Sequence, residues 1–108
     1  MEIVEYQDDA GRSPFADWFG TLDPQAAAKV TVTLARMELG NLASAKSVGG
    51  GLLEARLDYG PGYRLYFGRD GATLIILLAG GTKRRQQADI SDAQNRWADY
   101  KRRKKEAR

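Results

Sequence analysis

The chain has 108 residues, the length of one ordinary domain, and 43% of them are hydrophobic, which is enough for one modest core. It carries 17 Lys and Arg against 14 Asp and Glu, and it contains no cysteine and no histidine. The two absences exclude disulfides, zinc and haem sites built from those residues, and catalysis by Ser-His-Asp or Cys-His groups. A metal ion held by carboxylates alone stays open.

The positive charge lies in the second half of the chain. Residues 1–50 hold 4 basic and 7 acidic side chains, whereas residues 51–108 hold 13 basic and 7 acidic ones. The last eight residues, 101–108, are basic at six positions and acidic at one. This pattern predicts a polyanionic partner, nucleic acid first, with a solvated and frayed basic tail as the alternative explanation for residues 101–108.

The sequence contains no clear signal for membrane insertion or export. The longest purely apolar run, Leu74–Ala79, is far too short to span a membrane. The opening residues Met1–Glu5 are acidic and lack the basic region and apolar stretch of a signal peptide. We therefore expect a cytoplasmic protein with no membrane partner.

One strand and two helices are predicted at the start of the chain. Glu2–Tyr6 is short and β-branched, which is typical of a strand. Ser13-Pro14 and Asp23-Pro24 each combine an N-cap residue with proline at the first helical position. These signals predict a short helix from Pro14 and a second helix that ends at Gly40, joined as a helical hairpin.

The middle of the chain predicts a loop and three consecutive strands. Residues 41–51 end in three glycines, and we interpret them as a loop. The strands are expected at Leu52–Leu57, Tyr63–Phe67 and Thr73–Ala79, and Gly80–Thr82 is expected to end the last of them. Three strands in succession favour an antiparallel meander.

A last helix is predicted after a polar, basic connector at Lys83–Gln87. Asp89 or Ser91 is expected to cap it, and its apolar positions recur at helical spacing: Ile90, Ala93, Trp97 and Tyr100. The element order is thus β-α-α-β-β-β-α, an α+β domain with a small antiparallel sheet, an N-terminal helical hairpin and a C-terminal helix. No repeat or linker divides residues 1–108, so we expect a single domain.

Basic and aromatic side chains gather on one predicted face of the sheet. Alternation places Arg56 and Arg64 opposite the apolar residues of their strands. The run Lys83–Arg85 leaves the neighbouring strand end, and Tyr59 and Tyr66 lie among these cations in sequence. Such a mixture suits single-stranded RNA, in which phosphates take the charge and splayed bases stack on rings. The alternative is ordinary pairing of the two arginines with Glu54 or Asp58 on a solvated face.

Two stretches of the second half resemble a known family. Leu53–Phe67, which contains Gly62-Tyr63-Arg64, and Leu77–Ile90 are similar to the signatures of the RelE/ParE toxin superfamily, closest to its phage-derived addiction-module killer proteins, the HigB-like group. Trp97–Lys101 matches the same group. The resemblance covers nearly the whole chain and implies a RelE-like fold.

The resemblance implies the toxin of a type II toxin–antitoxin system that cleaves mRNA on the ribosome, without metal or cofactor. In such enzymes the ribose 2′-OH attacks the adjacent phosphate, which requires a base, cations and a proton donor. Arg64, Lys83 and Arg84 would be catalytic residues. The substrate-binding residues would be Arg56, Tyr59, Tyr66 and Arg85. The general base stays open, with Tyr59, Tyr66 and Asp89 as weak candidates, because the family's lysine pair and its later tyrosine have no counterparts here.

Two other functions stay open beside the endoribonuclease. One is a ParE-like toxin that poisons DNA gyrase by binding without chemistry, and the other is an inactive relative that only binds RNA or antitoxin. In each case the family implies a cognate helix-turn-helix antitoxin as a partner, and the nuclease also implies the ribosome and mRNA. A basic toxin favours an acidic or amphipathic segment in that antitoxin.

Overall fold

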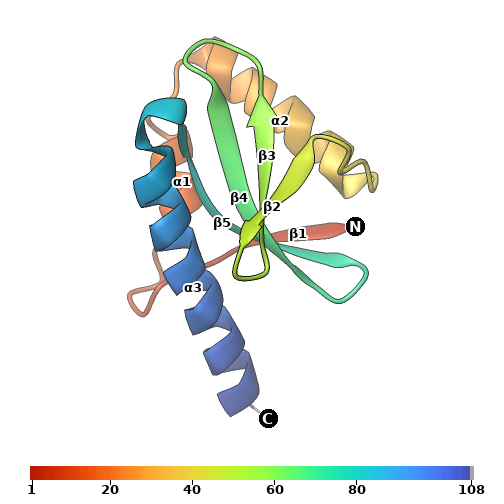
Figure 1. Ribbon diagram of the computed structural model, residues 1–108, viewed down its shortest axis with the longest axis vertical. Coiled ribbons are helices and arrows are strands. Elements are labelled where there is room, and N and C mark those ends of the chain that lie inside the picture. The colour runs from red at the N-terminus through yellow and green to blue at the C-terminus, as the bar shows by residue number, and fades with distance from the viewer. Residues whose placement is uncertain (108) are drawn as a thin grey trace.

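The structure is a computed structural model and describes residues 1–107. At its centre is one five-stranded sheet with the strand order β1-β5-β4-β3-β2 (Figure 1). β1 runs parallel to β5, and all other neighbours are antiparallel, so the predicted α+β class is confirmed. The strands are β1 (Glu2–Glu5), β2 (Ala45–Gly49), β3 (Leu52–Leu57), β4 (Tyr63–Asp70) and β5 (Leu74–Thr82).

The two N-terminal helices begin where the caps predict. Ser13 Oγ accepts a hydrogen bond from the backbone N–H of Ala16 at 3.0 Å, and Asp23 Oδ1 accepts one from Ala26 at 2.9 Å. Each cap is followed by a proline whose missing N–H costs nothing at that position. The helical elements are α1 (Pro14–Phe19), α2 (Pro24–Glu38), the 3₁₀ turn η1 (Lys83–Arg85) and α3 (Gln86–Glu106).

The structure corrects the expected loop at residues 41–51. Ala45–Gly49 forms the edge strand β2, which pairs with β3. Gly49, Gly50 and Gly51 all have positive φ, so they make the tight turn between the two strands. The strand escaped prediction because Ala45 and Val48 are its half-buried apolar side chains and the pattern between them is weak.

The boundaries around residue 82 are also corrected. β5 does not end before Gly80 but continues to Thr82, and α3 begins at Gln86 rather than at a cap by Asp89 or Ser91. A 3₁₀ turn over Lys83–Arg85 leads directly into α3, which therefore has no side-chain cap at its start.

The helices cover opposite faces of the sheet. α1 and α2 pack on one face, where the alternating apolar side chains of β3 and β4 form the larger core with Phe15, Val30 and Met37. α3 runs along the other face, where Ala93 and Trp97 pack against Leu52 and the neighbouring strands. The alternation predicted for β3 and β4 is confirmed, but α3 covers the part of the polar face that carries Glu54, Arg64 and Tyr66, whereas Arg56 stays exposed.

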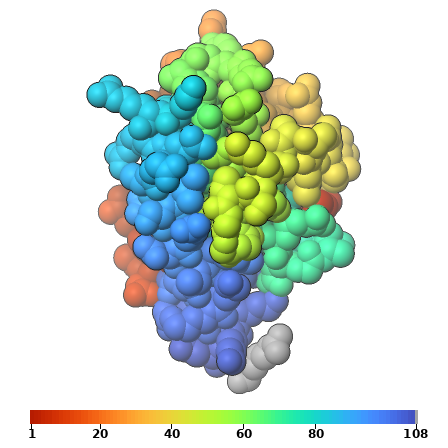
Figure 2. All heavy atoms as spheres, in the orientation of Figure 1, coloured from red at the N-terminus to blue at the C-terminus, as the bar shows by residue number. Residues whose placement is uncertain are grey.

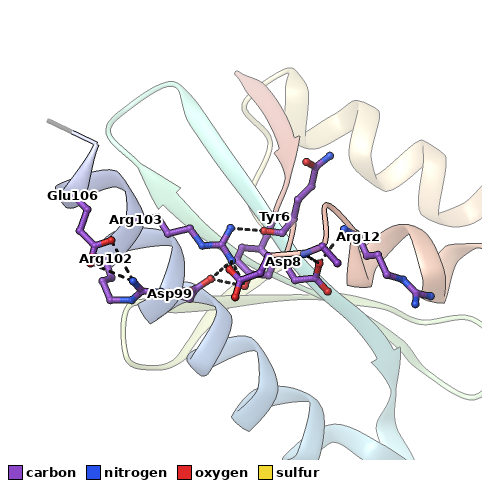
Figure 3. A network of polar contacts seen from close by, with 10 residues as sticks. Tyr6, Asp8, Arg12, Asp99, Arg102, Arg103 and Glu106 are labelled. Carbon is purple, nitrogen blue, oxygen red and sulfur yellow. Dashed lines mark hydrogen bonds and ion pairs between the residues drawn. The ribbon is translucent and has the colours of Figure 1, made fainter.

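The basic C-terminal segment is helical through Glu106, and Arg108 lies outside the described residues. Its lower part is fixed to the other end of the chain by a polar network (Figure 3). The Tyr6 hydroxyl donates to Asp99 at 2.6 Å, and Arg103 donates to the Gln7 carbonyl at 2.7 Å and forms an ion pair with Asp99. Residues 1–107 include no helix that is both long and apolar enough to cross a membrane.

Candidate functional site: a buried arginine–glutamate pair under the start of α3

Arg64 and Glu54 face each other between the sheet and the first turn of α3. They come from neighbouring strands, and Arg64 Nε lies 3.6 Å from Glu54 Oε2. The Arg64 guanidinium also donates to the Gly62 carbonyl at 2.9 Å, and Gln86 of α3 donates to Glu54 Oε2 at 2.8 Å. The pair is therefore held from three sides: the sheet, the β3–β4 turn and the helix.

Both members of this pair are shielded from water. Arg64 is 3% exposed and Glu54 is fully buried. Glu54 Oε1 has no hydrogen-bond partner and lies 3.9 Å from the exposed Lys46 ammonium of β2. Figure 2 shows this face: η1 and the start of α3, at the upper left, lie beside the β3–β4 turn and the β2–β3 hairpin and cover the sheet between them. The solvated pairing considered for Arg64 is therefore wrong, since its pairing with Glu54 is buried.

Tyr66 and Asp89 complete the polar cluster. The Tyr66 hydroxyl is buried without a hydrogen-bond partner, and burial together with the Glu54 and Asp89 carboxylates raises its pKa. Asp89 sits against Gly81, and one of its carboxylate oxygens, Oδ2, is buried and unpartnered. Burial raises the pKa of Asp89, partly offset by the nearby Arg85. An elevated pKa of the phenol leaves Tyr66 poorly suited to act as a base at neutral pH.

Exposed cations lie around this buried cluster. Arg56 is directly opposite Arg64 in the register of β3 and β4, and its guanidinium lies 3.7 Å from the exposed Asp58 carboxylate. The Lys83 backbone N–H donates to the Gly62 carbonyl at 3.0 Å, the same oxygen that Arg64 contacts. Gly62 thus brings the start of η1 next to Arg64. Lys83, Arg84 and Arg85 are exposed on η1.

The two tyrosines expected among the cations lie elsewhere. Tyr59 packs toward α2, where its hydroxyl donates to Gln25 at 2.9 Å, its ring stacks on Tyr63 and the Lys29 ammonium lies 5.5 Å from the ring centre. Tyr66 is 0% exposed beneath α3. The structure therefore brings Arg56, Arg64 and Lys83 together, with Arg84 and Arg85 beside them. Neither tyrosine offers a ring to a nucleic-acid base among these cations.

Sequence reasoning named Glu54 only as an ordinary, solvated partner of the two arginines, and it missed Gln86. Alternation already put Glu54 on the same face as Arg56, so the pattern held the signal that could have found it. Gln86 carried no such signal, because it fell in a segment interpreted as a connector. The burial of both depends on where α3 crosses the sheet, which no local pattern encodes.

The chemistry available here is that of cations and two carboxylates, Glu54 and Asp89. Within residues 1–107 there is no group of three or more His, Cys, Asp or Glu side chains that could hold a metal ion. The guanidinium and ammonium groups can neutralise a phosphate, and a carboxylate beside them can accept a proton. A base next to an anion-binding arginine is the arrangement that transfer within a phosphodiester needs.

Two comparisons place the chain beside known proteins. Residues 17–98 match the family described as phage derived protein Gp49-like (DUF891). An uncharacterized protein from Haemophilus influenzae is 40% identical over 80 residues, which are 73% of this chain and 81% of that protein. The matched family region contains β2 to β5 and the first half of α3, and so contains every residue of the cluster.

Proposed function

Because the chain belongs to the Gp49-like family of phage-derived, toxin-like proteins, we propose that it is the toxin of a type II toxin–antitoxin system and acts as a ribosome-dependent mRNA endonuclease. The observation that carries the proposal is the Arg64–Glu54 pair, which joins an anion-binding group to a proton acceptor at 3.6 Å. Exposed Arg56 and Lys83 lie next to this buried pair, so a phosphate on the surface would meet positive charge first.

In the proposed reaction Glu54 takes the proton of a ribose 2′-OH. The 2′ oxygen then bonds to the adjacent phosphorus, and the bond from phosphorus to the 5′ oxygen of the next nucleotide breaks. The products are a 2′,3′-cyclic phosphate and a free 5′-OH. Arg64 and Arg84 stabilise the extra negative charge on the phosphorane, and the Lys83 ammonium gives a proton to the leaving 5′ oxygen.

The reaction requires a change at Gln86. In the structure Arg64 is 3% exposed, so a phosphate reaches it only after the Gln86 side chain leaves Glu54. An incoming phosphate can drive this step because it offers Arg64 a charge-assisted hydrogen bond in place of the long contact to Glu54. Orientation by the ribosome and the mRNA supplies the remaining alignment.

The other predicted residues take binding roles. Arg56 and Arg85 would hold flanking phosphates of the RNA, since both are exposed near the buried Arg64–Glu54 pair. Tyr66, the register partner of Glu54, would pack beside its side chain, while Tyr59 would contact RNA that continues past the β3–β4 turn toward α2. The partners of the proposal are the ribosome, mRNA and an antitoxin of the helix-turn-helix type in the cytoplasm. Co-purification with a protein expressed from the neighbouring gene tests the last of these.

One observation favours a second function, a toxin or relative that only binds. Arg64 is buried and already paired, so it is not free to receive a phosphate as it stands. A ParE-like gyrase poison, or a relative that binds RNA or antitoxin with its exposed cations, needs no free arginine at this place. The two functions differ in what happens to nucleic acid in the cell.

The test is to induce the protein in bacteria and map new RNA 5′ ends within codons. We expect such ends with the wild type and with Arg69→Gln, a matched control that removes a cation from the far end of β4. Arg64→Lys and Glu54→Gln should produce neither new ends nor growth arrest, while circular dichroism shows that they fold. Growth arrest with intact mRNA would contradict the nuclease, and accumulation of cleaved DNA would identify a gyrase poison instead.

A further inference from the structure

A second hollow lies on the opposite flank of α3, at the upper end of β5. It encloses about 290 Å³ between α1, β5 and α3. β1 pairs with β5 only over Leu74–Leu77, whereas β5 continues to Thr82. Beyond Leu77 the outer edge of β5 therefore has no strand neighbour within residues 1–107, and α1 and the start of α3 form the walls there (Figure 1).

Two glycines let the walls come close to the strand. A Cβ atom on Gly80 would lie 2.1 Å from the Trp18 ring, and one on Gly81 would lie 1.9 Å from Asp89 Oδ2. Any larger residue at either position would push the indole or the carboxylate away. The glycine pair thus places a flat aromatic ring and a carboxylate on opposite sides of one short stretch of backbone.

The charges of this hollow are only partly used within the protein. Asp89 Oδ2 is buried without a hydrogen-bond partner. Arg96 donates to the Leu78 carbonyl at 3.2 Å, and Arg85 is exposed at the rim. Among the described residues no ion pair within 4.0 Å joins either arginine to Asp89. A buried acceptor without a donor is unusual enough in a folded protein to require an explanation.

We propose that this hollow binds the base of a guanine ribonucleotide, with Asp89 reading the base and Arg85 holding its phosphate. Guanine carries two adjacent donors, N1–H and N2–H₂, which a carboxylate can accept as a pair. Adenine and cytosine each offer one exocyclic amino group to such an acceptor. Trp18 lines the same hollow and contributes an apolar wall beside the base.

This inference rests on the proposed function, because it gives that reaction a sequence preference. Arg85 follows Lys83 and Arg84 on η1, so the hollow adjoins the cations of the cleavage site across the start of α3. An RNA strand that crosses η1 would place one phosphate at the Arg64 side and a neighbouring base at the Asp89 side. The expected preference is for cleavage next to a guanine.

The first experiment titrates the full chain with GMP, AMP and CMP and follows the Trp18 indole and the Gly80 and Gly81 amides by NMR. GMP should shift these signals and bind about tenfold or more tightly than AMP or CMP, the discrimination expected of one good paired contact. Equal binding of the three nucleotides, or shifts confined to other residues, would overturn the proposal.

Two variants separate base reading from simple charge. Asp89→Asn keeps the shape and supplies a donor in place of one acceptor, so the preference for GMP should vanish and AMP should gain. Asp92→Asn removes the same charge one turn along α3, so it should change the affinity for all three nucleotides alike. If Asp92→Asn abolishes the preference as fully as Asp89→Asn, then Asp89 does not read the base.

The outcomes also separate this proposal from the nuclease itself. Mononucleotides cannot be cleaved between residues, so the titration does not depend on catalysis. Preferred binding of GMP with intact mRNA in cells would leave the guanine site standing and reject the nuclease. Cleavage of mRNA without GMP binding or guanine preference would reject the guanine site alone. Shifts caused by an extended peptide but by no nucleotide would mean that the open edge of β5 takes a protein strand.

Discussion

The two halves of α3, the upper half at residues 86–95 and the lower half at residues 96–106, pack on the same sheet in different ways. In the lower half Trp97 lies over Gly68, where a Cβ atom would sit 2.6 Å from the ring, and the Tyr100 hydroxyl donates to Asp70 at 2.7 Å. In the upper half Ala93 packs in the core, but three buried polar atoms lack hydrogen-bond partners there: Glu54 Oε1, Asp89 Oδ2 and the Tyr66 hydroxyl. In the lower half Arg103 Nε is likewise buried without a partner.

We interpret the lower half of α3 as the part that anchors the helix on the sheet, and the upper half as the part that covers the candidate site. The lower half gains stability from buried rings and from the network around Asp99, which also lowers the pKa of that carboxyl, first through the Tyr6 hydroxyl. The upper half buries an ion pair and unsatisfied atoms, which is a poor way to gain stability. Polar groups retained under such conditions are candidates for function. Four substitutions can break or sharpen the comparison.

The largest effect is expected for Trp97→Ala. Trp97 is 6% exposed and stacks on Tyr100 with the ring centres 5.4 Å apart, so its loss leaves a cavity under the anchoring half. We expect the free energy of unfolding to fall by about 3–5 kcal/mol in urea titrations. Lys101→Ala, which removes only the cation over this ring, should cost far less. Similar losses for the two variants would contradict the anchoring role.

The next effect concerns the ion pair of the upper half. Glu54→Ala should destabilise the fold by about 3 kcal/mol, because Arg64 would remain buried without its partner. The double variant Glu54→Leu, Arg64→Met should recover most of that loss, because a well-packed apolar pair replaces two buried charges. Urea titrations of the three chains test this. A double variant less stable than Glu54→Ala would mean that the pair is retained for stability.

A smaller effect is expected for Tyr6→Phe in the anchoring network. It removes the hydroxyl that donates to Asp99 at 2.6 Å and should cost about 1 kcal/mol. Tyr59→Phe is the matched control, since its hydroxyl bonds to Gln25 near the surface and its loss should matter less. The order of the two melting temperatures checks the prediction, and a reversed order would refute it.

The smallest effect is a change with pH at Asp89. Burial raises the pKa of this carboxyl in the folded state, so its ionised form destabilises the fold above that pKa. Asp89→Asn should therefore increase stability at neutral pH, and the gain should fade as the pH drops below about 4, where both states of the wild type are protonated. Urea titrations of the wild type and Asp89→Asn, each at neutral and at acidic pH, measure how the gain in the free energy of unfolding changes with pH. A gain that persists in acid would have another cause.

Sequence patterns predicted the parts of this fold that depend only on residues close in the chain, such as helix caps and strand alternation. The caps at Ser13 and Asp23, and the alternation in β3 and β4, gave helix starts and strand faces that the structure confirms. The strand β2 could not be found in the same way, because it exists through pairing across a turn of glycines rather than through its own side chains.

The candidate site shows a similar limit. Its cations could be gathered on one face from alternation alone, but their burial depends on the path of α3. Strand alternation alone does not show that a helix covers the face with Glu54 and Arg64, so this face was predicted to be solvated. β5 extends to Thr82 and α3 starts early at Gln86, and Asp89 of α3 lies so close to Gly81 that a Cβ atom there would sit 1.9 Å from its carboxylate.

The central claim is that the buried Arg64–Glu54 pair serves RNA cleavage and not stability. The most direct measurement uses a purified translation reaction with one end-labelled mRNA and compares the wild type with the double variant Glu54→Leu, Arg64→Met. The claim predicts cuts with cyclic phosphate and 5′-OH ends for the wild type, and none for a double variant that is folded and stable. Equal cleavage by the two proteins, or an intact mRNA with the active wild-type toxin, would contradict it.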